Sequence, residues 1–180
     1  MLSFFRKFGN MIIKIAGLSD GLNFFEFKGL VKELKLDEPF RDNYSLKLTL
    51  DKSHSQLILS ASLYLKANFS CDRCGVEFTD TLTTDFKLVY LFGVAPEDTP
   101  DTEVLYLPFE ADKINIAKEV YDFALLSLPM KKLCKDDCAG ICPRCHVNLN
   151  SEPCVCKEDD VKPQWEALRQ LKNKYKTNNK

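Results

Sequence analysis

The chain has 180 residues, of which 45% are hydrophobic and 28% charged, a composition that excludes fibrous, collagen-like and wholly disordered proteins. Its formal net charge of -1 and isoelectric point near 6.2 argue against a generally basic, histone-like nucleic-acid binder. No apolar run approaches the roughly 18 to 20 residues of a membrane-spanning helix, so we expect no membrane partner.

The N-terminus has two basic residues before the apolar run Met11–Ile13, an order that also opens secretory signal peptides. Lys14 interrupts this run, so we favour a strand here, and translation could begin at Met1 or at Met11. Without export the thiols would lie in a reducing compartment, where disulfides are disfavoured and closely spaced cysteines more often bind metal.

Predicted strands dominate the first two-thirds of the chain. Tyr44–Asp51 and Leu57–Phe69 alternate apolar and polar side chains with a period of two, which indicates strands with one buried face. Val76–Phe92 is rich in threonine and aromatic residues, which favour a pleated surface. Shorter strands are expected at Met11–Gly17, Asn23–Lys28 and Val104–Leu107, with a turn at Ser19–Gly21. The segment Leu30–Leu36 is ambiguous and could be a short helix.

These spacings predict an α+β fold with an antiparallel β-rich sheet or a partly open barrel, and not a βαβ array. Residues 93–103 are rich in proline and acidic side chains and are expected to form a surface loop. One long helix is predicted from Asp112 or Asn115, its candidate caps, to about Leu128, because apolar residues recur there at helical spacing. Pro129 would end this helix, whose apolar stripe we interpret as core packing against the sheet.

The chain is therefore expected to have three parts. Residues 1–132 would form a β-rich domain with its packing helix, and residues 133–157 a Cys-rich zinc module. Residues 158–180 would form a C-terminal helix, Gln164–Tyr175, and a basic tail. From Val161 onward the tail has six lysines and arginines against a single acidic residue, Glu166.

Eight cysteines are the most informative feature of the sequence. Two C-x-x-C pairs, Cys71–Cys74 and Cys142–Cys145, each let both sulfurs turn inward on one tight loop and share a tetrahedral Zn²⁺. Gly75 follows the first pair, where a positive φ would help to close the loop. We expect two structural Zn²⁺ ions, each held by four thiolates, from the set Cys71, Cys74, Cys134, Cys138, Cys142, Cys145, Cys154 and Cys156.

Two arrangements of these cysteines into sites are possible. We favour a local site made by the four cysteines within residues 142–156, because closing a short loop costs less entropy, with the other four in a second site. The alternative joins the two C-x-x-C pairs, as in many zinc ribbons. His146 follows the second pair and could replace one thiolate, but four thiols already satisfy the metal, so we favour a histidine at a turn.

Other chemistries fit the cysteines less well. Thioredoxin-like redox activity needs a C-x-x-C motif that opens a helix beside a parallel sheet, and neither is predicted. An iron–sulfur cluster is chemically possible, but the separated pairs are more typical of zinc. A complete four-thiolate site leaves no open position for water or substrate, and no hydrolase triad order, HExxH or phosphate loop appears. We therefore predict no enzyme activity and no small-molecule substrate.

The segment Leu133–Asn150, followed by Cys154-Val-Cys156, resembles the YceD family of large ribosomal RNA subunit accumulation proteins. The Cys71–Cys74 pair after a β-rich half matches the other marker of that family. Two positions depart from it, Gly75 where Leu is usual and His146 where Gly is usual. The resemblance implies a bacterial cytoplasmic or plastid protein without catalytic residues that supports accumulation or processing of large-subunit (23S) ribosomal RNA and ribosome assembly.

Basic residues gather around the cysteines. Two four-thiolate zinc centres would each carry a charge of about -2 and repel phosphates unless cations lie nearby. Candidate RNA contacts, which could equally screen the thiolates, are Arg73, Lys131, Lys132, Lys135 and Arg144. The expected partner is large-subunit ribosomal RNA or a ribosomal protein. The alternatives are a protein–protein adaptor without direct RNA binding and an rRNA-processing or redox enzyme.

Overall fold

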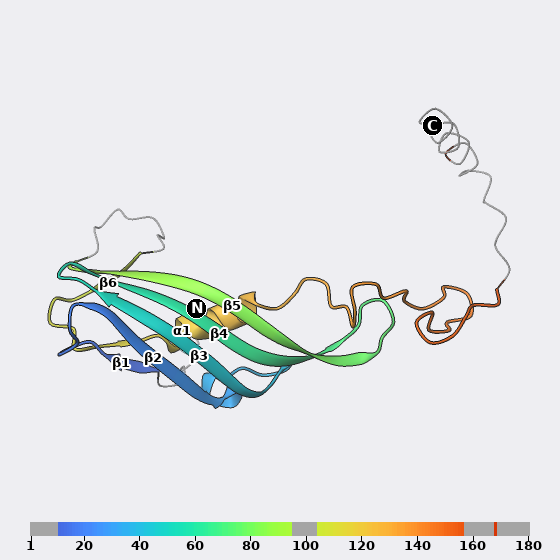
Figure 1. The fold of residues 1–180 in the computed structure, drawn as a ribbon, viewed down its shortest axis with the longest axis horizontal. Helices are drawn as coiled ribbons and strands as arrows, with labels where there is room; N and C mark the ends of the chain where they lie inside the picture. The colour runs from blue at the N-terminus through green and yellow to red at the C-terminus, as the bar shows by residue number, and fades with distance from the viewer. Residues whose placement is uncertain (1–10, 95–103, 157–167, 169–180) are drawn as a thin grey trace, which may run out of the picture. The chain divides into compact units, whose positions relative to one another are not determined.

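The computed structural model describes residues 11–94, 104–156 and 168 of the chain (Figure 1). By their internal contacts the residues divide into two units, Met1–Asp136 and Asp137–Lys180. The described residues of the first unit form a five-stranded sheet, a two-stranded sheet and one α-helix. Except for the helical Leu168, the predicted helix at 164–175 lies outside the described residues, as does nearly all of the predicted loop at 93–103.

The larger sheet confirms the predicted β-rich α+β fold. Its strands lie in chain order: β2 (Gly21–Leu30), β3 (Phe40–Lys52), β4 (Gln56–Ser70), β5 (Glu77–Phe92) and β6 (Val104–Leu107). Neighbours from β2 to β5 are antiparallel, as expected. The β5–β6 pair is parallel, with Val104 beside Val89, and differs in this from the other neighbours in the sheet. Within the described residues the sheet is open, with β2 and β6 at its edges, and the barrel alternative is not formed.

A second, two-stranded sheet pairs β1 (Ile12–Lys14) with β7 (Lys113–Asn115) in antiparallel register. The turn at Ser19–Gly21 therefore connects two different sheets. Strand β7 replaces the first turn of the predicted helix. The side-chain oxygen of Asn115 accepts a hydrogen bond from the backbone N–H of Ala117 at 3.1 Å, just where the helix begins.

The helix α1 (Ala117–Leu126) is shorter than predicted at both ends, and the backbone leaves α-helical geometry before Pro129 is reached. It lies across one face of the larger sheet (Figure 1). Val120 and Ala124 are buried there, and Phe123 stacks on Phe86 of β5 with ring centroids 4.3 Å apart. The apolar stripe of the helix is thus core packing, as predicted. The ambiguous segment before β3 forms a short 3₁₀ helix, η1 (Val31–Leu34).

Alternation along the strands gives the larger sheet an apolar inner face and a polar outer face. Leucines on β3 and β4 that face α1 are almost fully buried, and each contributes about 1.5–3 kcal/mol of stability. The intervening residues, such as Ser45, Thr49, Ser60 and Ser62, lie on the outer face. None of the helices in the described ranges has the length and hydrophobicity needed to cross a membrane.

Candidate metal centres

The first C-x-x-C loop closes the hairpin between β4 and β5. Cys71 follows the last residue of β4, and its backbone N–H donates to the carbonyl of Val76 at 2.9 Å. The N–H of Gly75 donates back to the carbonyl of Cys71 at 2.8 Å. Gly75 has a φ of +71°, the left-handed conformation that the sequence predicted for it. The sheet therefore holds the Cys71 and Cys74 sulfurs on one rigid turn.

The second C-x-x-C loop is built in the same way. The N–H of Cys142 donates to the carbonyl of Val147, and the N–H of His146 donates to the carbonyl of Cys142, both at 2.9 Å. His146 has a φ of 59°, so it occupies the left-handed position that Gly75 occupies in the first loop. The N–H of Arg144 points at the Cys142 sulfur, 3.5 Å away. Backbone donors aimed at sulfur are the arrangement that stabilises thiolates.

The eight sulfurs form two groups of four, and within each group all lie within 4.8 Å of one another. Measured separations include 3.6 Å between Cys74 and Cys134 and 3.3 Å between Cys142 and Cys154. Tetrahedral thiolates at a metal–sulfur distance of about 2.3 Å would lie about 3.8 Å apart, so both groups could hold a metal ion. The groups are the favoured pairing, Cys71, Cys74, Cys134 and Cys138, and Cys142, Cys145, Cys154 and Cys156. His146 belongs to neither group.

The thiols of Cys71 and Cys142 ionise readily. Burial opposes ionisation of Cys71, but hydrogen bonds from the backbone N–H groups around it, those of Cys134 and Arg73 first, lower its pKa to about 6. At Cys142 the N–H groups of Cys145 and Arg144, and then the Cys154 thiol, likewise lower the pKa to about 6. Each group therefore contains one sulfur that is a thiolate at neutral pH.

The last two cysteines of the second group resist ionisation. The neighbouring sulfurs of Cys145 and Cys154 raise the pKa of Cys156 to about 12. The N–H of Cys156 favours the Cys154 thiolate, but the Cys142 and Cys145 sulfurs outweigh it and raise the pKa of Cys154. Four sulfurs this close cannot all carry negative charge unless a cation lies among them. A bound metal ion supplies that charge.

Two side chains that the sequence analysis did not single out support the cysteines. Asp72 accepts a hydrogen bond from the N–H of Lys132 at 2.7 Å and donates its own N–H to the Lys132 carbonyl at 2.8 Å. Asn150 accepts from the N–H of Ala139 at 2.9 Å, and its amide donates to the Cys138 sulfur at 3.4 Å. These bonds position the chain beside the ligands, as outer-shell partners of metal sites do. In the sequence, the two asparagines of Asn148-Leu-Asn150 indicate a turn after the second C-x-x-C pair, and they do not by themselves indicate a contact with a cysteine.

The predicted RNA-contact residues do not behave alike. Lys132 is half-buried, and its ammonium lies 5.7 Å from the centre of the Phe69 ring, so part of its charge is used within the protein. The other four predicted contacts are exposed: Arg73, Lys131, Lys135 and Arg144.

Residues 59–172 match the family described as large ribosomal RNA subunit accumulation protein YceD. The chain belongs to this family. The match covers more than half of the sequence and includes all eight cysteines of the two groups. The YceD membership that the cysteine pattern predicted is thereby confirmed.

The individual relatives share only low sequence identity with the chain. The chain is 21% identical to large ribosomal RNA subunit accumulation protein YCED homolog 1, chloroplastic, of Arabidopsis thaliana, over 79% of this chain and 52% of that protein. It is 33% identical to an uncharacterised protein of Mycobacterium tuberculosis over 46% of this chain and 38% of the relative. The chain spans about half the length, or less, of these curated relatives. No solved structure matches it significantly.

Proposed function

We propose that the chain is a non-enzymatic factor that supports accumulation of large-subunit (23S) ribosomal RNA and assembly of the large subunit. The observation that carries this proposal is the family match, which spans both C-x-x-C loops and their partner cysteines. The family is described by accumulation of this RNA. We assign the protein to the cytoplasm and its partner to large-subunit ribosomal RNA or a ribosomal protein.

We further propose that each group of four sulfurs holds a structural Zn²⁺ ion. All the donors are cysteine sulfurs, and their separations fit a tetrahedron. Backbone N–H groups already stabilise the charge on Cys71 and Cys142, which favours metal binding. When bound, zinc contributes folding free energy, and four protein ligands leave it no position for a reacting water.

Native mass spectrometry of anaerobically prepared protein tests the metal assignment. We expect two zinc ions per chain and loss of one in a variant of either group. The low pKa of Cys71 and Cys142 also favours a second candidate, a thiol-redox enzyme, which needs reactive cysteines free of metal. A bare polypeptide whose thiols react at once with an alkylating reagent would support that candidate and contradict ours.

The exposed cations beside the cysteines are proposed as phosphate contacts, because they offset the negative charge of the zinc–thiolate centres. They are Arg73, Lys131, Lys135 and Arg144, with a lesser share for Lys132. Crosslinking and sequencing of RNA bound to the protein in cells tests direct contact. Recovery of ribosomal proteins without RNA would instead support a protein–protein adaptor.

Depletion of the chain from its host tests the function itself. We expect the ratio of large-subunit to small-subunit ribosomal RNA to fall, and to recover when the wild-type gene is supplied. An unchanged ratio would contradict the proposed role. Purified protein that cleaves precursor ribosomal RNA would replace it with an rRNA-processing enzyme.

A further inference from the structure

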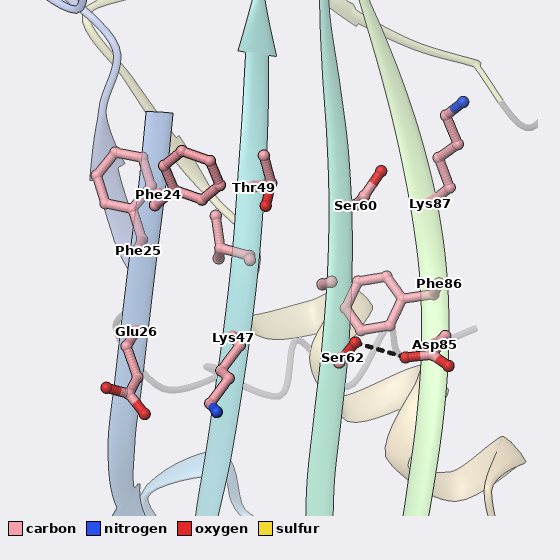
Figure 2. A pocket seen from close by; sticks show the side chains of 12 residues that line it. Phe24, Phe25, Glu26, Lys47, Thr49, Ser60, Ser62, Asp85, Phe86 and Lys87 are labelled. Atoms are coloured by element: carbon pink, nitrogen blue, oxygen red, sulfur yellow. Dashed lines mark hydrogen bonds between the residues drawn. The ribbon is translucent and has the colours of Figure 1, made fainter. Parts of the chain in front are cut away.

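The outer face of the larger sheet has two neighbouring troughs. The first has a volume of about 960 Å³ and is lined by side chains from β2 to β5 (Figure 2). Ser62 donates a hydrogen bond to Asp85 across it at 2.5 Å. Its charges cancel, since two lysines stand against two carboxylates, namely Lys47 and Lys87 against Glu26 and Asp85. This trough has no excess charge with which to select an ionic ligand.

The second trough, which we call the tyrosine trough, has a volume of about 490 Å³ and lies further along the same strands. No carboxylate belongs to the described residues that line it, whereas two lysines and several hydrogen-bonding side chains do. The residues that matter here are Lys28, Asn43, Ser45, Tyr64, Lys66 and Thr81. The excess of positive charge distinguishes it from its larger neighbour.

Strand register adds a third cation at the end of the tyrosine trough. Arg41 of β3 lies directly opposite Lys66 of β4. Like charges directly opposite on antiparallel strands destabilise a sheet. Within the described residues neither Arg41 nor Lys66 forms a salt bridge with a carboxylate, in contrast to Lys28, which pairs with Glu26. The sheet therefore retains an uncompensated positive pair beside the trough, which an anion would stabilise.

An aromatic ring stands next to this pair. Tyr64 precedes Lys66 by two residues on the same face of β4, and the residue is 39% exposed although it lies on a central strand. An exposed aromatic ring on a sheet is a stacking surface for a nucleobase, and flanking cations bind the phosphates. An acidic peptide would use the cations but would leave the ring and the amide of Asn43 without a role.

We propose that the tyrosine trough binds a single-stranded segment of RNA, with a base stacked on Tyr64 and phosphates at Arg41 and Lys66. This inference rests on the proposed function and gives it a binding surface separate from the cations beside the cysteines. Lys28, whose ammonium lies 2.9 Å from the Glu26 carboxylate, would contribute less than the other two cations.

Fluorescence anisotropy of the zinc-loaded full chain with a fluorescein-labelled oligouridylate of about twelve nucleotides tests the proposal, since such sites hold roughly 4–16 nucleotides. Tyr64→Ala should weaken binding by about 5- to 100-fold through lost stacking, whereas Tyr64→Phe should retain it. Arg41→Ala should lower the slope of log affinity against log salt by about one. Together these two results would show that RNA binding depends on the aromatic ring of Tyr64 and on a phosphate contact at Arg41.

Lys66→Glu gives a readout in which folding and binding move in opposite directions. The new carboxylate would face Arg41, so the thermal midpoint should hold or rise, while RNA affinity should fall about ten-fold or more. Lys113→Glu, on the exposed side of β7, makes the same charge change elsewhere and should alter affinity only slightly.

Three results would overturn the proposal. Tyr64→Ala and Lys66→Glu variants that bind RNA as tightly as the wild type does would place any RNA site elsewhere. Polyglutamate that displaces the labelled RNA as well as unlabelled oligouridylate does would identify a site for acidic proteins. Wild-type protein that binds no RNA would also exclude the site, while the depletion experiment would still decide independently whether the chain supports ribosomal RNA accumulation.

Discussion

The two C-x-x-C loops have the same turn geometry, but they differ in the residue that closes the turn and in the exposure of their cysteines. Gly75 closes the first loop at φ +71°, and no atom lies within 4 Å of where a Cβ would be. His146 closes the second loop at φ 59°, where an L-residue is strained. In the first group of cysteines Cys71 and Cys138 are buried, whereas in the second only Cys142 is buried, and two sulfurs belong to exposed residues.

This difference indicates that the same turn conformation can be stabilised either by a neighbouring sheet or, as we propose, by a bound metal ion. The first loop is an extension of β4 and β5, so the ladder of the sheet holds it. Around the second loop the described residues form the isolated Ile141–Asn148 bridge and several turn hydrogen bonds, and no strand ladder. A segment with so little buried apolar surface would depend for its stability on the metal ion that we propose for it. We therefore expect the second centre to respond more strongly to any loss of its ligands.

The largest effect is expected for Cys145→Ser. Zinc binding to such sites is worth on the order of 10 kcal/mol, so removing a ligand should unfold residues 139–156 and leave the sheet intact. Hydrogen–deuterium exchange read by mass spectrometry checks this, with loss of amide protection in that segment and preserved protection in β3 and β4.

Cys74→Ser is the matched control, because Cys74 holds the same place in the first loop. Protection should fall at the end of the β4–β5 hairpin and around Cys134, while residues 142–156 keep theirs. Unchanged exchange of residues 139–156 in Cys145→Ser would show that the second group is not a metal site.

A smaller effect is expected when the metal is removed from the wild-type protein by a chromogenic chelator. The second centre should release its zinc first, by about ten-fold in rate, because exposed Cys145 and Cys154 give the chelator access without opening of the sheet. The release trace should have two phases of one equivalent each, and Cys145→Ser should lack the fast one. A single phase would contradict the inequality of the two centres.

The sequence predicts what depends on local patterns. Period-two alternation located the long strands, and loop-closure entropy selected the cysteine grouping that the structure contains. Strand β7, with three residues, is too short to show a period, so the sequence pattern does not distinguish it from the start of the helix. The parallel β5–β6 pairing depends on the path of the chain between them, which composition does not encode.

Parts of the candidate sites could not be predicted, because they depend on register and on turn geometry. Lys28, Arg41 and Lys66 come from three strands, and their sequence neighbours give no sign that they meet. Asn150 is useful because its turn aims the amide at the Cys138 sulfur. Asp72 lies between two cysteines, and nothing in the sequence indicates that its side chain accepts a hydrogen bond from the Lys132 backbone.

Substituting the residue that closes each loop tests how much the strained left-handed backbone conformation lowers stability. Gly75→Ala should lower stability by about 1 kcal/mol, because the space is open and only the left-handed φ penalises the new side chain. His146→Gly should raise stability by a few tenths of a kcal/mol, since relief of strain exceeds the greater freedom of glycine in the unfolded chain. Thermal denaturation of the zinc-loaded proteins measures both. Equal destabilisation by both substitutions would mean that the His146 side chain has a contact worth more than its strain.

The smallest predicted effect concerns Glu119 on α1, which belongs to the unit with the larger sheet and to neither C-x-x-C loop. Burial raises the pKa of Glu119 on α1, with a further contribution from Asp122 and an opposing one from Lys118. One oxygen of its carboxylate is buried without a hydrogen-bond partner in the described structure, as is the Tyr90 hydroxyl. Burial raises the pKa of Tyr90, and the nearby Glu119 carboxylate raises it further.

Because the folded pKa of Glu119 lies above the usual 4.5, its protonated form favours folding below that pH, and this contribution is lost as the pH rises through the folded value. Glu119→Gln should therefore become more stable relative to wild type as the pH rises from about 4.5 to 7, by less than about 1 kcal/mol because the residue is partly exposed and solvent screens its charge. Urea unfolding of both proteins across that range, followed by the far-ultraviolet signal of the sheet, measures the difference. A difference in unfolding free energy between the two proteins that stays constant with pH would contradict this prediction. It would show that the Glu119 carboxylate has a hydrogen-bond partner in solution and that its pKa is not raised.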